Sequence, residues 1–126
     1  MSTSVIYNFE DRSNQLALVT MDEIPGGFLV PLLALSRGTW TVTWQLPKGF
    51  QFDSMEFETA SNWPPELKEE YSSRVAENSS QWTARLTNAA KGANQGAYKF
   101  TAIPITGGAP IPKDPTIVVT KDPIDT

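Results

Sequence analysis

Apolar and polar residues alternate in several short stretches of the chain, the pattern of β-strands that have one buried and one solvated face. The clearest stretch is 40–44, where Trp40, Val42 and Trp44 fall on one face and two threonines on the other. Residues 55–59 and 81–87 repeat the alternation. Further strands are expected at 5–9, 16–21, 27–35, 97–105 and 111–120, whereas the charged, proline-containing segment 62–73 is expected to hold at most a short helical turn.

These strands, about eight in number and separated by turn residues, are typical of an all-β protein, and we expect an immunoglobulin-like antiparallel β-sandwich with Greek-key connections. The stretch 94–98 resembles the tyrosine corner of such sandwiches, in which the hydroxyl of Tyr98 bonds back to the preceding turn. The chain has 126 residues, which is enough for one hydrophobic core but not for two. We therefore expect a single domain over residues 1–126.

The chain contains neither histidine nor cysteine. Their absence excludes disulfides, thiolate chemistry, the common zinc sites and nucleophiles activated by histidine, so neither a metal nor another cofactor is expected. The net charge of −4 comes without a basic cluster, so nucleic acid is not an expected partner. Any chemistry must use carboxylates, amines, hydroxyls and the backbone.

Neither the N-terminal residues nor the most apolar stretch predicts an export signal or a membrane span. Residues 1–11 lack a basic stretch followed by an apolar one. The most apolar stretch, 24–35, is broken by prolines and glycines and is shorter than the ~20 residues that span a bilayer. A cytoplasmic protein with no membrane partner is the default expectation.

The glycine pair 107–108 predicts a two-residue hairpin turn between the last two long strands. With that turn, Thr101 lies opposite Asp114, and Lys99 becomes a diagonal neighbour of Asp114 on the same face. Diagonal positions are about 7–8 Å apart, a gap that a lysine side chain spans. The simplest interpretation is an ordinary cross-strand ion pair, worth ~0.2–1 kcal/mol when exposed.

Asp114 is followed by Pro115, and this dipeptide allows a second interpretation. The aspartate carboxylate can attack its own main-chain carbonyl to form a cyclic anhydride, or activate a water for the same attack, while the proline nitrogen leaves. Capture of the acyl group by Lys99 would produce a cut backbone and a Lys99–Asp114 amide cross-link. A rigid sheet favours such a step, because well-oriented intramolecular reactions reach effective molarities of ~10⁵ M or more.

The residues from Asp114-Pro115 to a second acidic-proline pair, Asp122-Pro123, resemble the DP-EP family of small bacterial β-sandwich proteins. The resemblance implies a self-cleaving endopeptidase that cuts after Asp114 into 1–114 and 115–126, keeps the C-terminal strand in its sheet, and links Lys99 to the new aspartate. The partner of such a reaction is the chain itself. A cut before Pro115 would also make the last strand exchangeable and could expose an edge for self-association. The second pair departs from the family pattern, since Asp122 stands where the family name implies glutamate.

Three other side chains are candidates to assist this reaction. Thr101 shares the face of Lys99, and Glu56 or Glu58 would supply a protonated acid if their strand lies over the hairpin; the plainer role of both glutamates is a solvated strand face. Two non-catalytic interpretations also stand. A tryptophan platform could bind carbohydrate, with Trp63 as the one ring expected to be exposed, or an exposed edge strand could pair with another protein chain.

Overall fold

The computed structural model describes residues 3–6, 15–25, 27–60, 62–75 and 79–121. These residues form thirteen strands and no helix. In chain order the strands are β1 (Thr3–Ile6), β2 (Gln15–Thr20), β3 (Asp22–Ile24), β4 (Gly27–Leu29), β5 (Leu33–Leu35), β6 (Gly38–Gln45), β7 (Phe50–Glu56), β8 (Leu67–Arg74), β9 (Gln81–Asn88), β10 (Asn94–Ala97), β11 (Lys99–Pro104), β12 (Ile111–Lys113) and β13 (Thr116–Val119).

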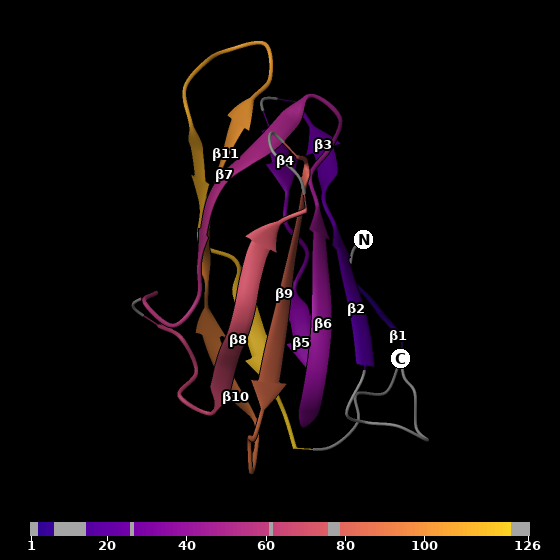
Figure 1. Cartoon of the computed structure of the whole chain (residues 1–126), viewed down its shortest axis with the longest axis vertical. Helices are drawn as coiled ribbons and strands as arrows, with labels where there is room; N and C mark the ends of the chain where they lie inside the picture. Colours follow the sequence, from indigo (N-terminus) through magenta and orange to yellow (C-terminus); the bar gives the residue numbers. More distant parts are fainter. Residues whose placement is uncertain (1–2, 7–14, 26, 61, 76–78, 122–126) are drawn as a thin grey trace.

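The strands build two packed layers (Figure 1). One layer is a five-stranded sheet in the order β1-β2-β6-β9-β8, and the other contains two three-stranded sheets, β10-β13-β5 and β12-β11-β7. A short β3-β4 pair completes the described sheets. The predicted all-β sandwich is confirmed. Two neighbouring pairs, β2-β6 and β13-β5, run parallel, and the others are antiparallel.

The core lies between the layers and is filled by the apolar faces that the alternation predicts. Trp40, Val42 and Trp44 of β6 are fully buried, and Tyr98 and Phe100 face them from the second layer. The Trp44 indole N–H donates a hydrogen bond of 2.8 Å to the Tyr98 hydroxyl. The tyrosine hydroxyl thus contacts the opposite sheet, whereas a tyrosine corner would bond it to the preceding turn.

Several strand predictions are corrected. The strand expected at 55–59 is found at Phe50–Glu56 as β7, so residues 57–59 lie beyond its end. The stretch 27–35 divides into β4 and β5, with Pro31 in the break, because proline has no N–H for a continuous ladder. The segment 62–73 contains no helical turn, and from Leu67 onward it forms β8 against β9. Its charged residues suit the edge position, where one row of backbone groups faces solvent. Part of the predicted first strand, residues 7–9, lies outside the described residues.

The last two long strands form one hairpin whose register differs from the predicted one. Phe100 pairs with Lys113 and Ala97 with Thr116, so both halves of the hairpin keep the same offset. The connection is the six-residue segment 105–110 and not the two-residue turn expected at 107–108. Pro104 precedes this segment and Pro110 ends it, and neither can donate to the ladder, so β11 and β12 stop pairing before residues 107–108.

Candidate functional site

Lys99 and Asp114 lie directly opposite each other across the hairpin. The pairs on either side define this position, because Phe100 pairs with Lys113 while the Tyr98 N–H donates a 3.2 Å hydrogen bond to the Pro115 carbonyl. The observed register differs from the predicted one by two residues. Because a shift by an even number of residues does not change which face a side chain is on, Lys99 and Asp114 share one face as predicted. Their contact is direct instead of diagonal.

The predicted ion pair is present, with 4.0 Å between Lys99 Nζ and Asp114 Oδ1. The two side chains are 49% and 69% exposed, so water reaches both of them. An exposed pair at this distance contributes about 0.2–1 kcal/mol at most. The ion pair therefore adds little stability to the fold. Its relevance to function is that it holds an amine beside an aspartate that precedes a proline.

Pro115 interrupts the hairpin ladder at the same point. The Tyr98–Pro115 pair makes the single hydrogen bond from the Tyr98 N–H, because Pro115 has no N–H to return the second one. Pro115 is buried while Asp114 is exposed, so the peptide bond between them crosses from solvent into the sandwich. The strands on either side belong to different sheets, β12 to one and β13 to the other.

The structure distinguishes between the two candidate glutamates. Glu56 pairs with Lys99 across β7 and β11, so Lys99 lies between Glu56 on one side and Asp114 on the other. Glu58 lies beyond the end of β7, and its carboxylate accepts a 2.8 Å hydrogen bond from the Glu69 N–H. Thr101 is half-buried on the Lys99 face, two residues along β11. Glu56 is thus the neighbouring acid.

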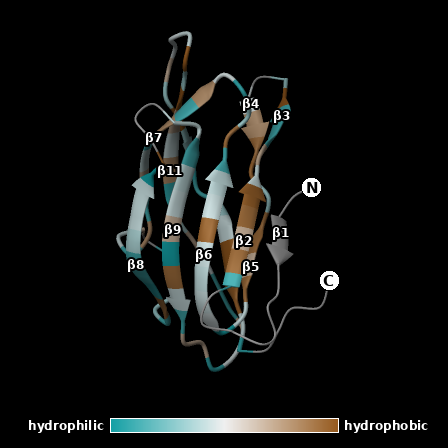
Figure 2. Ribbon diagram, turned by 45° about the vertical axis from the view of Figure 1, so that its right-hand side comes forward, coloured by the Kyte–Doolittle hydropathy of each residue, from teal (hydrophilic) through white to brown (hydrophobic). Residues whose placement is uncertain are grey.

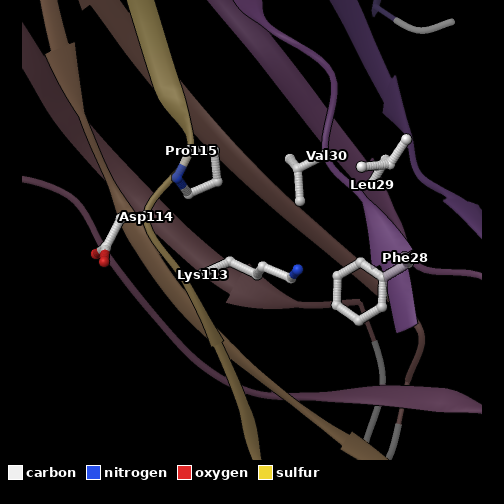
Figure 3. Close-up of a pocket in the computed structure, with 6 residues that line it drawn as sticks. All are labelled: Phe28, Leu29, Val30, Lys113, Asp114 and Pro115. Carbon is white, nitrogen blue, oxygen red and sulfur yellow. The ribbon is translucent and has the colours of Figure 1, made fainter. Parts of the chain in front are cut away.

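A small pocket adjoins the Asp114–Pro115 bond on the other side of the strand, and no pattern in the sequence predicts it. Its volume is about 190 Å³, and its lining is Phe28, Leu29, Val30, Lys113, Asp114 and Pro115. Figure 3 shows the Lys113 side chain reaching across this space toward Phe28, with its Nζ 5.0 Å from the ring centroid. Lys113 was missed because only the approach of β4, more than 80 residues earlier, gives it a role.

The strand that follows the Asp-Pro bond is held on both sides. β13 pairs with β10 and with β5, and its Ile117 and Val119 side chains are fully buried. The buried Asn88 side chain donates to the Leu35 and Thr120 carbonyls at 3.1 Å each. These contacts do not involve the backbone bond between Asp114 and Pro115, so they persist whether or not that bond is intact.

The tryptophan platform loses its expected exposed ring. Trp63 is partly buried, packs edge-on against Phe57 and donates its indole N–H to the Leu67 carbonyl at 2.6 Å. Trp40 and Trp44 are fully buried, and Trp82 packs partly buried against the core. None of the four rings is an exposed flat surface.

No family model and no curated protein matches the chain. Among the described residues, no group of three or more acidic side chains is arranged to hold a metal ion. The same part of the chain has no helix of the length and hydropathy needed to cross a bilayer. The geometry around Asp114 is therefore the feature of the described residues that points to a function.

Proposed function

We propose that the chain is a single-turnover endopeptidase that cleaves its own Asp114–Pro115 bond and links Asp114 to Lys99. The observation that carries the proposal is the 4.0 Å contact between Lys99 Nζ and Asp114 Oδ1, at the residue before the proline that interrupts the ladder. The exposed carboxylate gives water access, and the adjacent strand keeps the amine within reach. Both fragments, 1–114 and 115–126, remain together because β13 stays between β10 and β5.

The reaction has two steps. The Asp114 carboxylate attacks its own main-chain carbonyl carbon, and the bond to the Pro115 nitrogen breaks as that nitrogen takes up a proton. The resulting cyclic anhydride is then opened by Lys99 in its neutral amine form, which gives an amide, or by water, which gives two carboxyl groups. Glu56, opposite Lys99, is placed to accept the proton that the amine loses.

Three variants test this assignment by following the two fragments on denaturing separation at mildly acidic and neutral pH. Asp114→Ala is expected to abolish fragments 1–114 and 115–126. Lys99→Ala is expected to cut still, but to yield only the hydrolysed product, because the amine traps the anhydride and does not form it. The matched control Asp122→Ala, which removes the second Asp-Pro dipeptide, is expected to cut after residue 114 as the wild type does. Cutting by Asp114→Ala at that bond would contradict the proposal.

A second candidate is a non-catalytic binding or self-assembly module. The observation that favours it is the outer face of β2, where Leu16 and Leu18 are 50% and 39% exposed. Figure 2 shows β2 as a hydrophobic strand next to the paler β6. In this alternative the Lys99–Asp114 contact is a plain ion pair, and a protein partner covers β2. A chain that stays uncut and whose self-association is lost in Leu16→Ser/Leu18→Ser would favour this candidate over cleavage.

A further inference from the structure

The main-chain carbonyl of Asp114 faces away from the hairpin partner. In an antiparallel ladder, successive residues direct their backbone groups to opposite sides. Pro115 directs its carbonyl toward Tyr98, so Asp114 directs its own toward the side of β4 and β5. Thr120 is an even number of residues further along, so its backbone groups point to the same side as those of Asp114. Its N–H donates to the Leu35 carbonyl of β5 at 3.0 Å, which agrees with this direction.

On that side of Asp114 lies the pocket of about 190 Å³, where a paired strand would otherwise be. β4 pairs with β3 and β12 pairs with β11, and in the described sheets the two do not pair with each other. The Asp114 carboxylate points away from the pocket in Figure 3, so the part of Asp114 that lines it is the main chain. The carbonyl of the Asp114–Pro115 bond therefore borders the pocket.

Lys113 gives this pocket a positive charge. Its side chain is on the face opposite that of Asp114, half-buried, with its Nζ over the Phe28 ring. The remaining lining from β4 and Val30 is apolar. The Lys113 Nζ points to the Phe28 ring, so the ammonium acts across the pocket on negative charge that develops at the Asp114 carbonyl oxygen, and it disfavours the entry of another cation. The pocket thus suits a small neutral nucleophile.

We propose that this pocket admits a small neutral nucleophile to the main-chain carbonyl carbon of Asp114, and that Lys113 stabilises the oxyanion formed there. The inference rests on the proposed self-cleavage and adds a second, transamidating outcome to it. A nucleophile H–X adds to the carbonyl carbon of the anhydride, the ring bond to the side-chain oxygen breaks, and Asp114 regains its carboxylate. The proton of H–X passes to solvent, and Pro115 has already left as the amine.

The two faces of the strand then give different products. Lys99 approaches the Asp114 side chain from the outer face and forms its amide at the side-chain carbon Cγ. A nucleophile from the pocket ends on the main-chain carbon. The position of the new bond therefore reports which side the nucleophile came from.

Hydroxylamine is a suitable probe, because it is small, neutral at neutral pH and forms a stable hydroxamate. The full chain is incubated with it, and fragment 1–114 is sequenced by tandem mass spectrometry. We expect a hydroxamate on the Asp114 main-chain carbon. Leu29→Trp, which places a bulky ring at an exposed residue of the pocket lining, is expected to suppress it, whereas Leu32→Trp, a similarly exposed leucine outside the lining, is not.

Lys113 is tested separately by charge. Lys113→Met is expected to lower the rate of hydroxamate formation about 10-fold, which is less than the ~10²–10³-fold loss that follows removal of a directly bonded oxyanion donor. Lys113→Arg is expected to restore most of that rate. Hydroxamate only on Cγ, or equal yields from Leu29→Trp and Leu32→Trp, would overturn this inference while leaving self-cleavage intact. An uncut chain with and without hydroxylamine would overturn both.

Discussion

At the scale of single residues, Tyr98 is a titratable side chain that the core encloses completely. It is fully buried, its ring lies between Trp44, Phe57 and Phe100, and its hydroxyl accepts the Trp44 indole N–H. Burial raises the pKa of Tyr98 well above its ordinary value of 10.0, and the hydrogen bond from Trp44 offsets only part of that rise. The neutral phenol is therefore the form that the folded state holds.

This shift predicts a loss of stability in alkali. Above pH 10 the unfolded chain ionises Tyr98 while the folded chain keeps it protonated, so the unfolded state binds fewer protons and the free energy of unfolding falls as pH rises. The expected slope from this one group is up to about 1.4 kcal/mol per pH unit. Denaturant titrations at pH 9 and 11 should show this slope in wild type and in Tyr71→Phe, whose ring is half-exposed, but not in Tyr98→Phe. An unchanged slope in Tyr98→Phe would refute the assignment.

Residue faces were largely predictable, because period two is a local property of the chain. The buried positions of β6, the inward Met55 and Phe57, and the core position of Phe100 all follow from alternation. The same rule placed Lys99 and Asp114 on one face, and a register error of two residues does not change a face. The choice between Glu56 and Glu58 depended on where β7 ends, which alternation does not specify.

At the scale of elements, β10 requires a residue without a side chain. A Cβ on Gly96 would lie 2.2 Å from the Asn62 carbonyl oxygen and 2.6 Å from Pro64 Cδ, and the Ala97 N–H donates to that same carbonyl. The loop before β8 therefore lies directly on β10. Backbone atoms cannot move aside as a flexible side chain can.

Gly96→Ala is accordingly expected to destabilise the fold by about 1–3 kcal/mol, the usual cost of overpacking. Thermal or denaturant unfolding measures the change. Gly92→Ala is the matched control, since a Cβ there has no atom within 4 Å, and its effect should be small. Equal stabilities for the two variants would mean that the loop does not press on β10.

The hairpin register was the element-scale feature that the sequence did not predict. The glycine pair at 107–108 predicts a two-residue turn, but Pro104 and Pro110 cannot donate to the ladder, so the strands stop pairing before that turn. The break between β12 and β13 has a similar cause at Pro115. The pocket depends on β4 approaching β12, a contact between distant segments that no local pattern specifies.

At the scale of the whole molecule, cleavage should not release the C-terminal fragment. The buried Ile117 and Val119 side chains, two strand neighbours and the Asn88 amide hold it in place. We expect both fragments of the cut protein to elute together under native conditions and to separate in denaturant.

Asn88→Ala tests this retention. It removes the donor to the Leu35 and Thr120 carbonyls and the acceptor of the buried Ala90 N–H, and the loss of that acceptor costs about 1–3 kcal/mol. Native size-exclusion chromatography of the cut variant should show faster loss of fragment 115–126 than from cut wild type. Gln95→Ala, an exposed change on the neighbouring strand, should retain the fragment as wild type does. Equal release from both variants would show that the Asn88 side chain does not retain the fragment.

Self-cleavage itself is tested most directly by intact-mass spectrometry of the full chain under denaturing conditions, with tryptic mapping of the Lys99 peptide. Both outcomes separate 1–114 from 115–126 in denaturant, because Lys99 and Asp114 belong to the same fragment. The Lys99–Asp114 amide leaves fragment 1–114 one water lighter than hydrolysis does. We expect a cut between Asp114 and Pro115, with the Lys99 peptide joined to the peptide that ends at Asp114. A linear chain of all 126 residues with a free Lys99, after incubation at acidic and neutral pH, would contradict it.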